Sequence, residues 1–459
     1  MKKKITLLVA LVAVLFIGCK KDQKSSGTDL INTPYANKTV AETKTDVENN
    51  GVEAVDQMKS LNNETGMEAT VNFMSLLVKK DNSNAPSVLK ALNSYYSTKN
   101  VRTVLKAMRS TESDPLSIVD QFNKHVGIYK YNFVSGDFDS TYSPTNTIVF
   151  EFPASKTSKD DSVLDGTLTI NSPTVKTGPF TYGDQTVNEL PTSFSFDIKI
   201  NDVTGLSYLF SASYDDQGVP SKITSTLDIG AFEFKAALNY SKSASDVDFS
   251  IKHDTKTIID IGGGVNGNFD KTNIENAYHY EYDTMWYYDP YQQKEVYSID
   301  TNKVTDPDKI LTDANAHFQL MNIKVAGQVD FKDLYTNMKA IDDKESNQII
   351  TTADAVNQRA DLINKDMVLI VVYADSNTKI AQAEAYEKED QWTDYYGITQ
   401  TDYSMDVRMI FADKSKNSLD TYFQEGFNGL IDEINSFLGD LNTKYGWNLN
   451  PVSAPSNSK

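Results

Sequence analysis

The residues that follow Gly127 alternate between apolar and polar side chains, and this period of two constrains the fold more than any other feature. Every second residue is aromatic or aliphatic in GIYKYNF (127–133) and again in TIVFEF (147–152), with the turn residues Ser135 and Gly136 between them. Further segments of this kind follow, separated by turn residues. Adjacent short strands with tight turns form antiparallel meanders, so we predict a sandwich or an open curved sheet with one solvated face.

Helical spacing of apolar residues is found on both sides of this region. In MEATVNFMSLLVKK (67–80), apolar residues recur at intervals of three and four, as on one face of a helix. A similar stripe lies near the C-terminal end, where we expect Ser418 to cap the helix and the stripe to pack on the preceding sheet. The stripe consists of Phe423, Phe427, Leu430, Ile431, Ile434, Phe437 and Leu441.

The first residues have the layout of a secretory signal. Lys2, Lys3 and Lys4 precede an apolar, uncharged run from Ile5 to Ile17. A membrane-spanning helix needs roughly 20 apolar residues, so this run is too short to span comfortably, and its flanks are those of an export signal. The alternative is an N-terminal membrane helix that contains a free cysteine.

Cys19 is the only cysteine of the chain, and it follows this run directly after Gly18. The sequence Phe16-Ile17-Gly18-Cys19 resembles the lipobox of bacterial lipoproteins, although Phe16 departs from the usual aliphatic residue. The resemblance implies cleavage between Gly18 and Cys19, a diacylglycerol on the Cys19 thiol and acylation of the new amino terminus. Two or three acyl chains would hold the protein stably in a membrane, since each buried methylene contributes about 0.8 kcal/mol. With no second cysteine, the exported body must rely on a packed core.

The residues after Cys19 are polar and contain few large apolar side chains, which is typical of a disordered tether. Lys20 stands where lipoproteins retained at the inner membrane carry Asp, which favours the outer membrane. Lys21 and Asp22 resemble the start of a surface-export tag, so both the periplasmic face and the cell surface stay open. The predicted organisation is: 1–18 signal peptide, 19–44 lipidated flexible tether, 45–126 helical region, 127–300 antiparallel β-rich region, 301–446 mixed α/β region ending in an amphipathic helix, and 447–459 flexible tail.

These regions together define the predicted fold class, which is α+β. It combines a helical N-terminal part, an antiparallel β-meander or curved sheet in the middle, and a mixed sheet plus a long C-terminal helix. The segments GIYKYNF, VFEFPAS, LPTSFSFDIKI and SASYDDQGVP, in that order, resemble uncharacterised cell-envelope lipoproteins of Bacteroidota. The resemblance covers roughly Gly127 to Asn239, implies location and architecture, and brings no known activity with it.

The charge of the chain limits its partners. Removal of Lys2, Lys3 and Lys4 from the 44 basic residues leaves 41 against 63 acidic ones, a formal net charge of −22. An acidic chain is a poor candidate for nucleic-acid binding, which needs a basic face. Nor should the body adhere to anionic lipid, so we expect membrane attachment through the N-terminal acyl chains alone.

The stretch AYHYEYDTMWYYDPYQQKEVY (277–297) contains the densest group of aromatic residues. If these residues lie on a surface loop, their flat aromatic faces could stack on sugar rings. If they lie in a strand or a domain contact, we expect the rings to be buried and their O–H and N–H groups to be hydrogen-bonded. The residues that we consider for ligand stacking are Tyr280, Tyr282, Trp286, Tyr287 and Tyr288.

No catalytic residue, metal site or cofactor is predicted. The four histidines, His125, His253, His279 and His317, have no zinc-binding spacing, and we expect them to be packing or surface residues. The glycines of DIGGGVNGNFD (260–270) lack the Lys-Ser/Thr of a phosphate loop and suggest a flexible turn.

The leading hypothesis is a non-enzymatic, lipid-anchored binding or structural protein of the outer membrane with a glycan, lipid or protein partner. One alternative is an envelope hydrolase with an unrecognised carboxylate pair, because such pairs meet only in three dimensions. The other is a periplasmic carrier of an apolar ligand.

Overall fold

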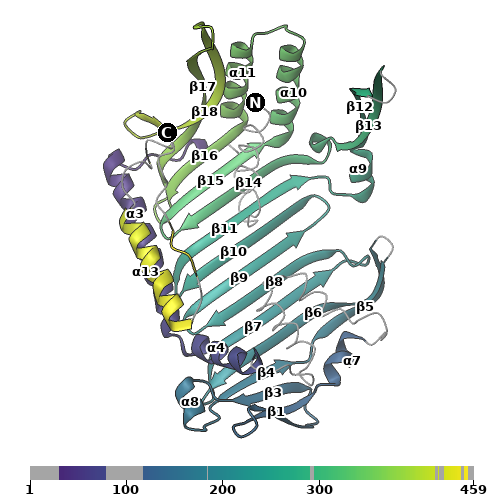
Figure 1. The fold of residues 1–459 in the computed structure, drawn as a ribbon, viewed down its shortest axis with the longest axis vertical. Coiled ribbons are helices and arrows are strands. Elements are labelled where there is room, and N and C mark those ends of the chain that lie inside the picture. Colours follow the sequence, from purple (N-terminus) through teal and green to yellow (C-terminus); the bar gives the residue numbers. More distant parts are fainter. Residues whose placement is uncertain are drawn as a thin grey trace. The chain divides into compact units, whose positions relative to one another are not determined.

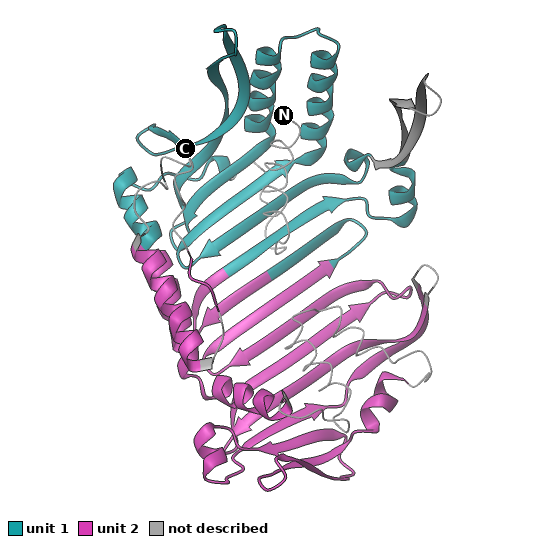
Figure 2. Cartoon of the chain, viewed as in Figure 1, with its two compact units in different colours: residues 1–48, 240–248, 260–427 teal, residues 49–239, 249–259, 428–459 magenta. Residues whose placement is uncertain are grey.

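A computed structural model gives the fold of the chain (Figure 1). It describes residues 30–78, 117–182, 185–289, 294–418, 422, 428–445 and 449–452, with the backbone alone described between 279 and 305. Two compact units are distinguished (Figure 2). Unit 1 takes residues 1–48, 240–248 and 260–427, and unit 2 takes residues 49–239, 249–259 and 428–459. Each unit is therefore built from segments that are not consecutive in the sequence.

The α+β class is confirmed. Among the described residues, the strands of each unit are joined by hydrogen bonds into a sheet, and β12 (Tyr278–Asp289) and β13 (Lys294–Thr305) form a separate two-stranded ribbon. Most of the neighbouring strands pair antiparallel, and one pair at the start of the chain's β-region is parallel. Strand β1 (Gly127–Asn132) pairs antiparallel with β2 (Asp137–Thr141) and parallel with β3 (Thr147–Phe152). The hairpin partner β2 takes one edge of β1, so the chain must return to the other edge, and there it runs parallel.

Unit 2 is centred on a β-sheet whose buried face follows the sequence alternation. Ile148, Phe150 and Phe152 of β3 are at most 1% exposed, and they pack with Phe73 of helix α4 (Thr65–Val78). The predicted period of two is thus confirmed, because alternate side chains of a strand point to one face. The other strands that lie in unit 2 or end at its border are β4 (Gly166–Asn171), β5 (Thr174–Tyr182), β6 (Gln185–Ile200), β7 (Val203–Tyr214), β8 (Pro220–Ile229) and β9 (Phe232–Tyr240).

The C-terminal helix α13 (Asn428–Tyr445) makes a contact that the sequence did not predict. Its Glu433 forms an ion pair with Lys59, and Leu430 lies against Gly51, where an added Cβ would come within 2.7 Å of a Leu430 methyl carbon. Both partners belong to helix α3 (Val40–Lys59), so within unit 2 the stripe contacts a helix in addition to any sheet contact. Ser418 does not cap α13, because it pairs with Arg408 as the last residue of strand β19. Phe423 and Phe427 lie outside the described residues.

Unit 1 contains an antiparallel meander covered in part by two helices, α10 (Phe331–Ser346) and α11 (Thr352–Asp366). Helix α11 begins with a capping box between Thr351 and Asp354, and Ala355, Val356 and Ala360 are its buried residues. The meander strands are β14 (Leu311–Leu320), β15 (Ile323–Asp330), β16 (Met367–Tyr373), β17 (Thr378–Thr393), β18 (Thr399–Ile410) and β19 (Lys416–Ser418). The remaining elements are α7 (Ile118–Asn123), α8 (Lys156–Asp160), α9 (Lys271–Asn276), β10 (Ala244–His253), β11 (Lys256–Gly267), β12 (Tyr278–Asp289), β13 (Lys294–Thr305), and the 3₁₀ helices η1 (Ser60–Asn63) and η2 (Pro307–Lys309).

The glycine-rich segment is a strand, and the predicted flexible turn is wrong. Gly262, Gly263, Gly264 and Gly267 all belong to β11. At Gly267 the absence of a side chain is required, because a Cβ there would overlap the carbonyl oxygen of Ile310. Glycine in a strand interior commonly marks such a close approach of another backbone.

None of the described helices is both long enough and apolar enough to cross a bilayer.

Candidate functional site at the N-terminal segment

The first described part of the chain, residues 30–47, lies on unit 1, and we call it the N-terminal segment. Thr33 and Thr43 are 8% and 2% exposed, and Leu30 packs against a cluster that includes Ile370. The predicted flexible tether of 19–44 therefore does not extend past residue 29. Composition predicted disorder because large apolar residues are few, but this segment is held by backbone pairing and by buried polar groups.

Tyr35 pairs with Lys379 of β17 in a short parallel bridge. The amide of Ala36 donates to the carbonyl of Lys379 at 2.8 Å, and the amide of Lys379 donates to the carbonyl of Pro34 at 2.6 Å. The Tyr35 hydroxyl also donates to the Ile410 carbonyl at 3.4 Å. The N-terminal segment thus uses the main chain of β17 as its partner, in the manner of strand addition.

The side chain of Lys379 strengthens this bridge from within unit 1. Lys379 is 3% exposed, and its ammonium donates to the carbonyl of Ile31 at 3.0 Å and to Oε1 of Gln382 at 2.9 Å. The same ammonium lies 4.6 Å from the centroid of the Tyr35 ring, within the range of a cation–π contact. Burial, with a smaller contribution from Lys414, lowers the pKa of Lys379. Both acceptors are uncharged oxygens. The positive charge of Lys379 is therefore stabilised by the dipoles of the Ile31 carbonyl and the Gln382 amide and by the face of the Tyr35 ring.

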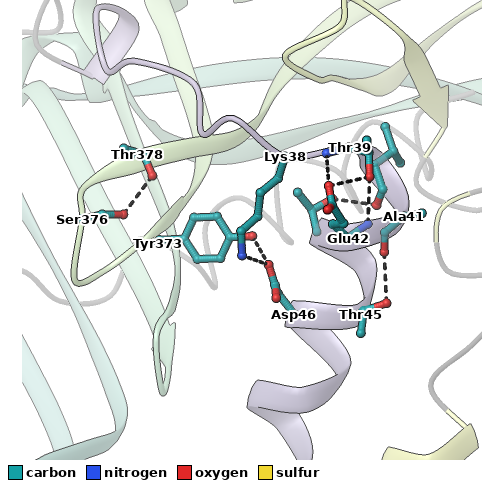
Figure 3. Close-up of polar contacts among 11 residues, drawn as sticks. Lys38, Thr39, Ala41, Glu42, Thr45, Asp46, Tyr373, Ser376 and Thr378 are labelled. Carbon is teal, nitrogen blue, oxygen red and sulfur yellow. Dashed lines mark hydrogen bonds and ion pairs between the residues drawn. The ribbon is translucent and has the colours of Figure 1, made fainter.

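A second contact joins the start of helix α3 to β16 (Figure 3). The Tyr373 hydroxyl donates to the Asp46 carboxylate, which also accepts from the Lys38 ammonium at 2.6 Å. Burial opposes ionisation of Asp46, but the hydrogen bonds from Lys38 and Tyr373 outweigh it and lower the pKa of Asp46. Burial, followed by the hydrogen bond to Asp46, raises the pKa of the Tyr373 hydroxyl well above its usual value. The hydrogen bond between them therefore extends the pH range in which Asp46 is charged and Tyr373 is protonated.

The first turn of α3 is fixed by its own capping residues (Figure 3). The Glu42 carboxylate accepts from the Thr39 amide and from the Thr39 hydroxyl, both at 2.8 Å, and the Glu42 amide donates back to that hydroxyl at 3.3 Å. This reciprocal pattern satisfies backbone donors that a helix start leaves unpaired. The hydrogen bond from the Thr39 backbone is the main cause that lowers the pKa of Glu42. Helix α3 thus begins at a defined residue, Val40, shortly after the bridge at Tyr35.

Apolar contacts complete the attachment of the N-terminal segment. Ala36, Val40 and Val47 pack against a buried cluster of unit 1 that includes Ile380 and Phe411. Complete burial of a valine side chain contributes roughly 1.5–3 kcal/mol, so partial burial of the two valines contributes about 1–3 kcal/mol together. These apolar contacts, the bridge at Tyr35 and the buried Lys379 together hold the N-terminal segment on unit 1.

The residues predicted for lipidation and cleavage, Cys19 and Gly18, lie outside the described residues. The five aromatic residues considered for ligand stacking are placed only by their backbone. Strand β12 pairs with β13 over its whole length, with Trp286 opposite Tyr297 and Tyr282 opposite Thr301. Tyr278, at the start of this ribbon, is 38% exposed. Ligand stacking by Tyr280, Tyr282, Trp286, Tyr287 and Tyr288 stays a prediction.

Two histidines have packing roles in the described structure. The His253 ring stacks on Phe232 with 4.3 Å between centroids, and its Nδ1 lies 2.6 Å from Oε1 of Gln57. The Nε2 of His317 lies 3.0 Å from Oδ2 of Asp260. Within the part of the chain that the structure describes, no group of three His, Cys, Asp or Glu residues could hold a metal ion.

Sequence reasoning missed an exposed aromatic group at the turn between β17 and β18. Tyr395 and Tyr396 are 97% and 83% exposed, and Trp392 and Ile398 are 49% and 56% exposed. The signal was present in the sequence, because Asp394 and Gly397 are turn residues that separate two strand-like runs.

Comparison of the chain with protein-family models, with curated proteins and with solved structures gives no match.

Proposed function

We propose that this protein is a lipid-anchored protein of the cell envelope whose acyl chains on Cys19 hold it at the outer membrane. Its role in this proposal is non-enzymatic, as a binding or structural protein. The observation that carries the proposal is the fixed attachment of the N-terminal segment to unit 1 through Tyr35, Lys379 and Asp46. The attachment fixes the place on unit 1 where the described chain begins, eleven residues after Cys19.

The attachment also limits how far the body could stand from its anchor. Eleven residues, 19–29, precede the first described residue, Leu30. A fully extended chain spans at most about 3.6 Å per residue, so the anchor would lie within about 40 Å of Leu30. A lipid-anchored binding protein with this tether would work close to the membrane surface.

The test is substitution of the only cysteine. Cys19→Ser removes the thiol that would carry the diacylglycerol, and Ser25→Ala is a matched control in the same segment. We expect Cys19→Ser to abolish labelling with an alkyne palmitate analogue and to release the protein from the washed membrane fraction, while Ser25→Ala behaves as wild type. Unchanged labelling and membrane retention of Cys19→Ser would refute the lipid anchor.

A further inference from the structure

Four exposed apolar or aromatic side chains gather at the end of one hairpin of unit 1, and we call Trp392, Tyr395, Tyr396 and Ile398 the aromatic tip. Tyr395 and Tyr396 are the most exposed of them, at 97% and 83%. Exposed aromatic groups of this kind are costly in water and commonly mark a binding surface. The aromatic tip is therefore a candidate binding surface.

The hairpin that carries the aromatic tip extends past its neighbours. Strand β16 pairs with β17 only from Thr378 to Gln382, whereas β17 pairs with β18 as far as Thr393 opposite Thr399. The last six residues of β17, 388–393, are all exposed, so both faces of the hairpin meet solvent there. Such a two-stranded extension buries little and contributes little to the core, which favours a role in binding.

The turn between the strands is rigid although it is exposed. Oδ1 of Asp394 accepts from the amides of Tyr396 and Ile398, both at 2.9 Å, and the Asp394 amide donates to the Ile398 carbonyl at 3.0 Å. Gly397 adopts a positive φ of 77°, which a residue with a side chain adopts at a cost. The hydrogen bond from the Ile398 amide, followed by those from the Gln400 side chain and the Tyr396 amide, lowers the pKa of Asp394 although burial opposes this.

The aromatic rings are also held in defined positions. The rings of Tyr395 and Tyr396 meet edge to face, with 5.6 Å between centroids and 83° between planes. The indole Nε1 of Trp392 donates to Oδ2 of Asp402 at 2.9 Å. Pre-ordered rings lose little conformational entropy when a ligand binds, and Tyr and Trp have few rotatable bonds.

The charge of the hairpin end excludes anionic ligands. Residues 389–404 contain four acidic residues and no Lys or Arg. An anionic lipid surface, a nucleic acid or an anionic polysaccharide would be repelled. The other exposed polar side chains are amides and hydroxyls, which can exchange hydrogen bonds with the hydroxyls of a neutral sugar. These side chains are Gln391, Thr393, Thr399, Gln400 and Thr401.

We infer that the aromatic tip binds a neutral oligosaccharide, whose C–H faces stack on Tyr395 and Tyr396 and whose hydroxyls bond to the neighbouring amides and hydroxyls. The negative face of an aromatic ring attracts the slightly positive C–H groups of a pyranose. This inference rests on the binding role proposed above and is independent of the lipid anchor. It also assigns the sugar contact to residues outside the aromatic stretch at 277–297.

The test measures oligosaccharide binding by the full chain in detergent solution. Isothermal titration calorimetry uses maltohexaose, cellohexaose, xylohexaose, mannohexaose and chitohexaose as probes. We expect saturable binding of at least one probe by the wild type, and a loss of at least about tenfold in affinity for Tyr395→Ala/Tyr396→Ala, since two stacking faces are removed. Tyr142→Ala is the matched control, because Tyr142 is 78% exposed and lies in unit 2. It should bind as the wild type does.

Further variants separate stacking from other causes. Tyr395→Phe/Tyr396→Phe keeps both faces and should retain most of the affinity. Asp394→Asn keeps a side-chain acceptor for the turn and should bind more tightly than Asp394→Ala. Failure of all five probes to bind the wild type, or equal affinity of the double alanine variant, would overturn the inference. The inference would also be overturned if no sugar bound and the aromatic tip were instead required for binding of phosphatidylglycerol vesicles or of a polylysine peptide. Because Cys19 is unchanged in every variant, these outcomes leave the anchor test unaffected.

Discussion

The ammonium of Lys379 lies 4.6 Å from the centroid of the Tyr35 ring, and the backbones of the same two residues form the bridge that fastens the N-terminal segment to β17. One lysine thus contributes a main-chain bridge, two side-chain hydrogen bonds and a cation–π contact. The local stability of residues 30–47 should depend on it more than on any exposed ion pair, since exposed pairs contribute about 0–1 kcal/mol.

Lys379→Met tests this dependence. Methionine retains the length of the side chain but leaves the Ile31 carbonyl and the Gln382 amide oxygen without their donor, at a cost of about 1–3 kcal/mol. Amide hydrogen exchange in residues 33–47, followed by mass spectrometry, should accelerate by about tenfold or more. Lys388→Met is the control, because Lys388 lies on the same strand with its side chain 46% exposed. Equal exchange in the two variants would contradict the importance of the buried lysine.

The contact between Tyr373 and Asp46 predicts a loss of stability at alkaline pH. The pKa of Tyr373 is raised in the folded protein, so the folded state holds a proton that the unfolded state releases above about pH 10. The free energy of unfolding should therefore be unaffected by this group below pH 10 and fall above it, by up to about 1.4 kcal/mol per pH unit.

Tyr373→Phe should lower stability at pH 7 by roughly 1–3 kcal/mol, because a hydrogen bond to a charged group is lost. It should also show a shallower decline above pH 10, so that the two profiles converge. Urea unfolding at pH values from 7 to about 11 measures both effects. Tyr395→Phe, which removes a hydroxyl from an exposed ring, should follow the wild type. Parallel profiles for Tyr373→Phe and the wild type would show that the Tyr373 hydroxyl does not titrate as proposed.

Two glycines of unit 2 should respond in opposite directions to alanine. Gly66 of α4 is buried, and a Cβ there would overlap the carbonyl oxygen of Gly205 in β7. Because a backbone atom cannot move away cheaply, Gly66→Ala should destabilise the protein by about 1–3 kcal/mol. At Gly439 of α13 an added Cβ would meet no described atom within 4 Å, so Gly439→Ala should stabilise the helix by about 0.5–1 kcal/mol.

Urea denaturation followed by circular dichroism compares the two glycine variants with the wild type. A neutral Gly66→Ala would mean that α4 does not approach β7 as closely as described. A destabilising Gly439→Ala would mean that the outer face of α13 is covered by another part of the protein.

Local patterns were the reliable part of the sequence. The alternation of Ile148, Phe150 and Phe152 identified the buried face of β3, because a strand repeats every two residues whatever its partner is. The turn at Ser135 and Gly136 was also placed correctly, since β1 and β2 pair from Asn132 and Asp137 outward. The signal-like run before Cys19 is also a short-range feature, and the export and lipidation that it predicts stay predictions.

Long-range pairing could not be predicted in the same way. Nothing near Lys379 in the sequence indicates that Tyr35 and Ile31 would cover it, and a lysine is ordinarily exposed. The glycines of β11 suggested a turn, because the sequence shows only that they have no side chains. It does not show that the backbone of Ile310 occupies the space beside Gly267. The exposure of Tyr395 and Tyr396 could not be predicted either, since aromatic residues are also common in protein cores.

By itself, then, the sequence determined the strand-rich α+β class and the buried face of β3, and it motivates the proposed anchor at Cys19. The tertiary structure decided that the N-terminal segment is bound to β17, that α13 contacts α3, and that the aromatic residues at the β17–β18 turn face solvent. The physical reason is that periodicity reports which side of an element is apolar, whereas the identity of the covering surface depends on segments that are distant in the chain.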